Sequence, residues 1–219
     1  MDLSFALITE GITDQAALEA IVAGHYKRLD PDIECDFTFV QPIRDKTDES
    51  LQGNFAGWER VLEKCSTPDV ARNALAYSDY LIVQIDTDVG EQRNFGLALT
   101  ENGVDIDETG LITAAKAIIV DRFGEVWEEI RDQTIMAICV HSLECWLLVL
   151  HAPAQDACST KGCEARLSRV LARQNVVFDK EHDTYRRLSR NFRKPRHLAA
   201  AQVRSISLDT FLRSLPRPG

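Results

Sequence analysis

The 219 residues include 25 Lys and Arg, 34 Asp and Glu, and 45% hydrophobic residues, a composition typical of a globular protein and not of a disordered chain. The N-terminal stretch MDLSFALITEG has no basic residues ahead of its short apolar run, and no apolar run approaches the roughly 20 residues that span a bilayer. These features argue against a signal peptide and against a membrane protein. They predict a cytoplasmic protein.

The charge is divided unevenly along the chain. Residues 1–160 contain 11 basic and 29 acidic side chains, whereas residues 161–219 contain 14 and 5. An acidic body with a basic C-terminal segment suits a metal site beside a surface that binds a polyanion. A solvated basic surface packed on its own acidic partner is an equally open alternative.

The six cysteines lie mostly in apolar surroundings, so we expect reduced thiols. Only Cys158 and Cys163 are spaced like zinc ligands. A zinc site needs four ligands, and the remaining two are not evident even if His141, Cys145 or His151 were recruited. We therefore favour thiols over a zinc site.

The first predicted strand is the apolar run over residues 3–9, which ends at Glu10 and Gly11. A helix follows, with Thr13 as its expected cap and Asp14 in its first turn, where the helix dipole favours an acid. A second strand is predicted over residues 35–41. The polar residues 42–54 are expected to form a loop, and residues 55–75 to form two helices divided at Pro68.

The third predicted strand, YLIVQID over residues 80–86, contains a single uncharged polar residue, Gln84. Such a run is typical of a strand buried on both faces of a parallel sheet. It ends in Asp86 and Asp88, followed by Gly90. An Asp-rich turn after a strand is the plain alternative for these acids.

A polar excursion over residues 91–110, a long helix over residues 111–133 and a fourth strand over residues 135–140 complete the pattern. The fourth strand ends at Ser142 and Glu144. Alternating strands and helices predict an α/β, Rossmann-like fold with a mainly parallel four-stranded sheet flanked by helices. A basic, largely helical C-terminal extension follows.

Three strand ends thus carry acids: Glu10 with Asp14, Asp86 with Asp88, and Glu144. Ligands of open α/β sheets bind at the carboxyl ends of the strands. Converging carboxylates repel one another unless a cation lies between them, so we predict one or two Mg²⁺ or Mn²⁺ ions at this edge.

The C-terminal segment interleaves aromatic residues with basic ones. Tyr185 and Phe192 lie among the arginines that we expect to bind nucleic acid: Arg186, Arg187, Arg190, Arg193 and Arg196. Such clusters neutralise the phosphates of a nucleic-acid backbone. A helix with a solvated basic face is the alternative.

The Glu-Gly turn after the first strand, Asp-x-Asp after the third and Ser-x-Glu after the fourth resemble the Toprim fold. In particular, the chain is similar to the Toprim nuclease domains of the OLD family and to stand-alone Toprim-like proteins encoded beside ATPases in bacterial phage-defence systems. The resemblance covers residues 3–150, the expected catalytic domain being residues 1–150. Residues 191–203 and 205–215, within the extension at 151–219, also look like the tails of those stand-alone proteins.

The resemblance implies a metal-dependent nuclease that cuts DNA or RNA. Glu10 would be a general acid/base or metal ligand, Asp86 and Asp88 would bind Mg²⁺, and Asp14 and Glu144 would complete a second metal site. Gly11, Gly90 and Ser142 would support these motifs. The family's tail lysine would correspond to Lys194, with Lys161 as a rival.

Partners implied by the resemblance are DNA or RNA and a separate ATPase, with a homo-oligomer also open. Two other functions compete with the nuclease. One is a Toprim-like scaffold that binds an ATPase or nucleic acid without chemistry. The other is a haloacid-dehalogenase-type phosphatase with Asp86 as nucleophile, although that motif follows the first strand of that family and the third strand here.

Overall fold

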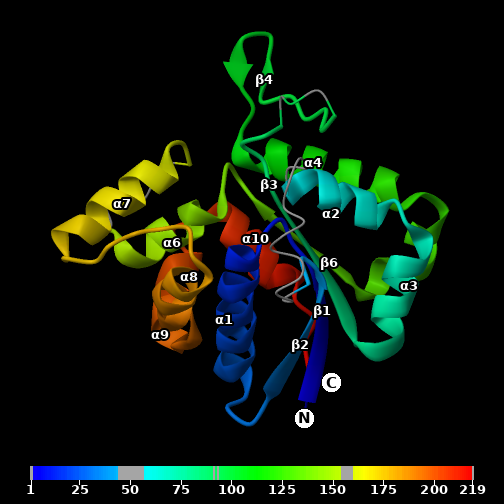
Figure 1. Cartoon of the computed structure of the whole chain (residues 1–219), viewed down its shortest axis with the longest axis horizontal. Helices are drawn as coiled ribbons and strands as arrows, with labels where there is room; N and C mark the ends of the chain where they lie inside the picture. Colours follow the sequence, from blue (N-terminus) through cyan, green and yellow to red (C-terminus); the bar gives the residue numbers. More distant parts are fainter. Residues whose placement is uncertain (1, 44–56, 91, 93, 154–159, 219) are drawn as a thin grey trace.

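The structure is a computed structural model that describes residues 2–43, 57–90, 92, 94–153 and 160–218. Its centre is a four-stranded sheet in the order β2-β1-β3-β6, and every pair of neighbouring strands is parallel (Figure 1). The strands are β1 (Asp2–Ile8), β2 (Glu34–Gln41), β3 (Tyr80–Asp86) and β6 (Thr134–Cys139). The predicted α/β fold with a parallel four-stranded sheet is confirmed.

Ten α-helices are assigned in the described parts of the chain, joined in places by single 3₁₀ turns. The helices are α1 (Ile12–Leu29), α2 (Gly57–Cys65), α3 (Pro68–Tyr77), α4 (Glu108–Phe123), α5 (Trp127–Ile130), α6 (Leu143–His151), α7 (Cys163–Arg173), α8 (His182–Ser189), α9 (Pro195–Gln202) and α10 (Ile206–Ser214). The 3₁₀ turns are η2 (Gly124–Val126), η3 (Arg131–Gln133) and η5 (Arg190–Arg193).

Successive side chains along each strand point to opposite faces of the sheet, so they belong to two separate hydrophobic cores, one on each face. On β3, Ile82 packs with α1 and with the helices from α6 onward, whereas Val83 and Ile85 pack with α2 and α4. The central strands are buried on both faces, which is why the third strand reads as a continuous apolar run.

The C-terminal segment builds part of one of these cores. Tyr185, Phe192 and Phe211 are at most 2% exposed and belong to the cluster that includes Phe5 of β1. Helix α1 touches η5 so closely that a Cβ placed at Gly24 would lie 2.0 Å from the Phe192 carbonyl oxygen. The basic segment therefore shares the hydrophobic core of the sheet.

Two local predictions need correction. Helix α1 begins at Ile12 with Gly11 as its N-cap, and its cap makes no side-chain hydrogen bond, so Thr13 does not cap it. The long helix predicted over residues 111–133 is interrupted after Phe123, where Gly124 has a φ of 56° that a continuing α-helix does not allow.

The predicted polar excursion contains an antiparallel hairpin of β4 (Thr100–Glu101) and β5 (Val104–Asp105) that projects from the body of the protein (Figure 1). Most of the predicted loop over residues 42–54 lies outside the described residues. No described helix is long and apolar enough to cross a membrane.

The prediction that all six cysteines are reduced is wrong for two of them. Cys145 and Cys163 form a disulfide, because α7 begins against the first turn of α6 and brings the two Cα atoms within 5.0 Å. Cys35, Cys65 and Cys139 are free thiols. Cys158, the other half of the pair weighed for zinc, lies outside the described residues.

Candidate functional site

The carboxyl ends of β1 and β3 meet at the point where the strand order of the sheet reverses. Strand β1 has β2 on one side and β3 on the other, so the chain leaves the two neighbouring strands β1 and β3 in opposite directions. Such a point opens a crevice in which α/β proteins bind their ligands. Glu10 follows β1 and Asp86 ends β3, so both acids lie at this crevice.

Glu10, Gln84 and Asp86 form a closed circuit of hydrogen bonds. The Glu10 N–H donates to Gln84 Oε1 (3.1 Å), Gln84 Nε2 donates to Asp86 Oδ1 (2.8 Å), and the Asp86 N–H donates to Glu10 Oε1 (2.6 Å). Gln84 is fully buried, and its side-chain amide both accepts from Glu10 and donates to Asp86. The circuit fixes the orientation of both acids.

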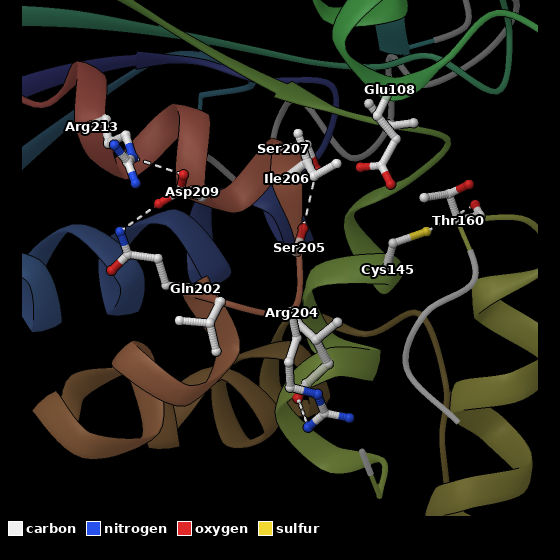
Figure 2. A pocket seen from close by; sticks show the side chains of 13 residues that line it. Glu108, Cys145, Thr160, Gln202, Arg204, Ser205, Ile206, Ser207, Asp209 and Arg213 are labelled. Carbon is white, nitrogen blue, oxygen red and sulfur yellow. Dashed lines mark hydrogen bonds and ion pairs between the residues drawn. The ribbon is translucent and has the colours of Figure 1, made fainter. Parts of the chain in front are cut away.

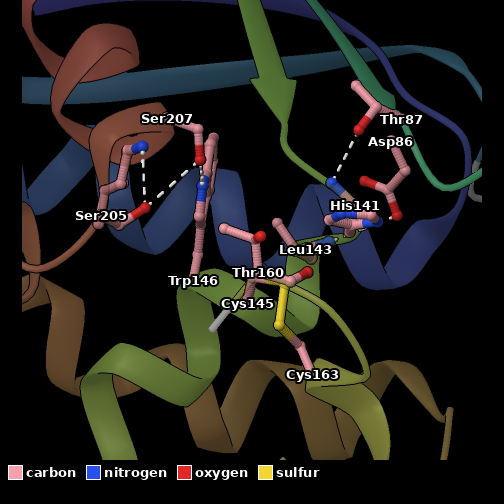
Figure 3. Close-up of a disulfide and its surroundings, with 11 residues drawn as sticks. Asp86, Thr87, His141, Leu143, Cys145, Trp146, Thr160, Cys163, Ser205 and Ser207 are labelled. Carbon is pink, nitrogen blue, oxygen red and sulfur yellow. Dashed lines mark hydrogen bonds between the residues drawn. A yellow bond between two sulfur atoms is a disulfide. The ribbon is translucent and has the colours of Figure 1, made fainter. Parts of the chain in front are cut away.

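Hydrogen bonds also join the end of β6 to the end of β3. His141 accepts from the N–H groups of Thr87 and Asp88 through its carbonyl oxygen, at 2.9 Å each, and donates its own N–H to Thr87 Oγ1 (Figure 3). Its φ of 62° is unusual for a residue with a side chain. The Leu143 N–H donates to Asp86 Oδ2 at 3.3 Å, which brings the start of α6 to the same carboxylate.

These ends enclose a cavity of about 320 Å³, which we call the acid cavity. It is lined by residues from β3, α1, α6, α7 and α8 together with the segments that join them. The lining residues are Thr13, Asp14, Asp86, Asp88, His141, Ser142, Glu144, Gly162, Cys163, Glu164, Lys180 and Tyr185. Glu10, predicted as a ligand, is not among the lining residues, but its carboxylate accepts a hydrogen bond from the Asp86 N–H.

Glu144 is held by two groups that the sequence did not reveal. The buried Tyr185 hydroxyl donates to Glu144 Oε1, and Lys180 Nζ lies 3.9 Å from the same oxygen. Lys180 also pairs with Glu164 at 2.8 Å. One lysine thus faces the carboxylates of the acid cavity.

Four carboxyl groups at the crevice, those of Glu10, Asp14, Asp86 and Asp88, have raised pKa values. Burial, followed by the charges of neighbouring acids, raises the pKa of Glu10 from 4.5 to about 8, although the hydrogen bond from the Asp86 N–H opposes the shift. Burial and Glu144 raise the pKa of Asp14 from 3.8 to about 7. The pKa of Asp86 is raised well above its usual range by burial and by Glu10, and that of Asp88 by burial and Glu144. A divalent cation would relieve this repulsion.

The donor set fits a hard cation in type and in place, since Asp14, Asp86, Asp88 and Glu144 offer carboxylate oxygens to one cavity. Within the described parts of the chain, however, no group of three or more His, Cys, Asp or Glu side chains stands arranged as a finished metal site. Asp86 accepts one hydrogen bond on each oxygen, from Gln84 Nε2 and the Leu143 N–H, and these bonds orient its carboxylate while leaving further lone pairs for an ion.

A second cavity, of about 680 Å³, lies between α1 and α8 and includes most of the predicted nucleic-acid-binding residues. We call it the arginine cavity. It is lined by Ala16, Glu19, Ala20, Asp183, Arg186, Arg187, Arg190 and Arg193. Arg196, in α9, is exposed and is not among its lining residues. Because α1 and α8 line both cavities, the two follow the same seam between helices.

The lysines expected from sequence lie elsewhere. Lys194 is the exposed N-cap of α9, and Lys161 pairs with Asp105 of the β4–β5 hairpin at 2.6 Å. Lys180 precedes α8 and lines the acid cavity in their place. No sequence motif marks it, because only the packing of α8 on α1 brings it to the strand ends.

The supporting residues have definite places. Ser142 is the N-cap residue of α6 and lines the acid cavity. Gly11 is the N-cap of α1, where a Cβ would lie 3.1 Å from Asp14 Oδ2, and a Cβ at Gly90 would lie 2.9 Å from the Leu97 carbonyl oxygen. Sequence reasoning missed Gly57, where a Cβ would lie 2.5 Å from the Glu10 carbonyl oxygen.

Comparison with known proteins gives no match: no family model, no curated protein and no solved structure is similar to this chain.

Proposed function

We propose that this protein is a metal-dependent nuclease that hydrolyses phosphodiester bonds of DNA or RNA. The observation that carries the proposal is the acid cavity, in which five acidic side chains and Lys180 lie at the reversal point of a parallel sheet. Burial and mutual repulsion raise the pKa values of Asp14, Asp86 and Asp88, and a divalent cation between carboxylates would relieve that repulsion.

The arginine cavity supports a polyanionic substrate. Along α1, Asp14 of the acid cavity and Ala20 of the arginine cavity are six residues apart, a rise of about 9 Å. A nucleic-acid strand with one phosphate at the carboxylates would therefore present further phosphates to Arg186 and Arg190. The order of Glu10, Asp86 with Asp88, and Glu144 on successive parallel strands also supports the resemblance to Toprim nucleases.

Each side chain has a definite task in this proposal. Asp14, Asp86, Asp88 and Glu144 would hold one or two Mg²⁺ or Mn²⁺ ions, which supply charge neutralisation and activation of a water molecule. Lys180 would stabilise negative charge on the phosphate, and Tyr185 would hold Glu144 in place. Glu10, with a pKa of about 8, can retain a proton near neutral pH and exchange it beside Asp86.

A scaffold without chemistry is the second candidate, favoured by the absence of a finished three-ligand metal group among the residues described. Such a protein would bind nucleic acid in the arginine cavity, and its acids would take no part in catalysis. In either case, the likeness to stand-alone Toprim-like proteins suggests a separate ATPase as partner and a role in phage defence.

The experiment is a cleavage assay with end-labelled single-stranded and duplex DNA and RNA, with Mg²⁺, Mn²⁺ or EDTA, and with and without a candidate ATPase. Wild type is compared with Asp86→Asn and, as a matched control, with Asp121→Asn at an exposed position on α4. The nuclease proposal predicts metal-dependent products from wild type and the control alone. Nucleic-acid binding without products would support the scaffold, and phosphate trapped on Asp86 would support the phosphatase.

A further inference from the structure

The Cys145–Cys163 disulfide lies against the proposed metal site. Cys145 follows Glu144 in the first turn of α6, and Cys163 precedes Glu164 at the start of α7 (Figure 3). Gly162, Cys163 and Glu164 form part of the lining of the acid cavity. The disulfide therefore fastens one side of that cavity to the helix that carries Glu144.

This fastening has an electrostatic consequence. Glu164 is the 2.8 Å partner of Lys180, which in turn lies 3.9 Å from Glu144. While α7 is held by the disulfide, the negative charge of Glu164 stays at the cavity and offsets Lys180. If the start of α7 moves away, the cavity loses a negative charge and Lys180 loses a partner.

Only the first turn of α7 depends on the disulfide in this way. Leu167 and Leu171, further along α7, are at most 1% exposed and belong to the hydrophobic core. At the other end, Gly162 adopts a left-handed conformation with a φ of 66°, which gives the chain a turn just before the helix. Breaking the disulfide would thus release Gly162 to Glu164 while the rest of α7 remains packed.

The disulfide also separates two cavities. Cys163 lines the acid cavity, and Cys145 lines a different cavity of about 470 Å³ together with Thr160, Glu108 and Ser205 (Figure 2). Cys145 and Cys163 are only 6% and 3% exposed, so a thiol reagent would have to approach the sulfur atoms through one of these two cavities. Cys145 Sγ lies 3.2 Å from the Thr160 carbonyl oxygen, so a reduced thiol at this position has a hydrogen-bond acceptor ready.

We propose that the Cys145–Cys163 disulfide is a redox-exchange site for dithiol reductants, and that its reduction weakens divalent-cation binding in the acid cavity. A reductant thiolate attacks one sulfur and forms a mixed disulfide, and its second thiol then displaces the cysteine. Two electrons and two protons pass from the dithiol, which becomes a disulfide, to the protein, which gains two thiols. The inference rests on the proposed metal site and adds its regulation.

The test is Mn²⁺ titration by calorimetry of the oxidised protein and of protein reduced with dithiothreitol and freed of reductant under argon. Peptide mapping after alkylation establishes the state of each cysteine. We expect reduction to raise the Kd for Mn²⁺ roughly 3- to 10-fold, because one negative charge leaves the cavity. Reoxidation should return the Kd to its original value. A Cys145→Ser/Cys163→Ser variant should match the reduced protein, and Cys35→Ser, at the free thiol on β2, should respond to reduction like wild type.

Hydrogen exchange of residues 160–166 provides a second measurement that needs neither a variant nor a metal. We expect exchange there to rise on reduction while residues 167–173 stay protected. An unchanged Mn²⁺ Kd in fully reduced protein, or alkylation of both cysteines before any reduction, would overturn the inference. If neither form binds Mn²⁺, the metal site itself fails, and unchanged hydrogen exchange would then reject the opening of α7 separately.

Discussion

The backbone N–H of Asp86 donates a 2.6 Å hydrogen bond to the Glu10 carboxylate, which joins the ends of the two strands at the reversal point of the sheet. This bond places two acids with raised pKa values beside each other. Burial of these acids, followed by their mutual repulsion, costs stability in the metal-free protein. It also makes the site responsive to protons, to neighbouring side chains and to cations.

Stability of the metal-free protein should fall as the pH rises. The folded state holds protons on Glu10 up to about pH 8 and on Asp14 up to about pH 7, whereas their ordinary values are 4.5 and 3.8. Folding therefore binds protons between about pH 4 and pH 8, and the stabilisation present at low pH is lost through this range. Urea midpoints in EDTA should decrease from pH 5 to pH 8.5.

The acids responsible can be identified by substitution. Glu10→Gln combined with Asp14→Asn should reduce the pH dependence of the urea midpoint, and Glu63→Gln, an exposed position on α2, should leave it unchanged. A double variant with the same slope as wild type would contradict the assignment to these two carboxyl groups.

Gln84→Met should weaken cation binding more than it affects folding. Methionine fills a similar volume but neither accepts from the Glu10 N–H nor donates to Asp86 Oδ1. Groups that orient metal ligands typically contribute 10- to 100-fold to metal affinity, so we expect a loss of about 10-fold in calorimetric Mn²⁺ titrations. Gln133→Met is the control, because it removes a solvent-exposed hydrogen bond from the Gln133 side-chain amide to the Asp79 carbonyl oxygen. Equal Mn²⁺ affinities in the two variants would refute the positioning role.

Arg190→Ala should reduce nucleic-acid affinity in a salt-dependent manner. If Arg190 contacts one phosphate in the arginine cavity, the slope of log K against log salt should decrease by roughly 0.7 to 0.9. Arg72→Ala is a suitable control, since Arg72 pairs with Glu129 on the other face of the sheet. Fluorescence anisotropy with labelled oligonucleotides measures both, and identical slopes for the two variants would count against the proposed path of the strand.

Gly24→Ala should destabilise the whole protein. A Cβ at this position would lie 2.0 Å from the Phe192 carbonyl oxygen, so α1 and η5 would have to separate. Overpacking of this kind typically costs about 1–3 kcal/mol. Gly96→Ala, where a Cβ would meet no atom within 4 Å, reports the cost of the left-handed backbone alone. Thermal unfolding should show the larger loss for Gly24→Ala.

The sequence was sufficient to predict the four strands of the parallel sheet and the acids at their ends, but not the β4–β5 hairpin. Strand β3 has the predicted bounds because a strand buried on both faces has an unmistakable apolar run. Asp86, Asp88 and Glu144 line one cavity because the carboxyl ends of parallel strands meet at one edge. The acids were predicted from their positions just after the strands, and their proximity follows from the fold.

What could not be predicted depends on contacts between distant parts of the chain. Lys180 reaches Glu144 only because α8 packs on α1, and nothing in the residues around Lys180 distinguishes it from Lys194. The Cys145–Cys163 pair spans 18 residues of sequence and forms because α7 begins beside α6. Gln84 was visible as a polar residue in an apolar strand, but its role required the positions of both neighbouring acids.

The most direct test of this account is calorimetric titration of Mn²⁺ into the wild-type protein and into an Asp86→Ala/Asp88→Ala variant at neutral pH. The account predicts that wild type binds Mn²⁺ with release of protons, since ions replace protons on the buried acids, and that the variant loses this binding. Equal Mn²⁺ binding by both proteins would contradict the assignment of the acid cavity as the metal site.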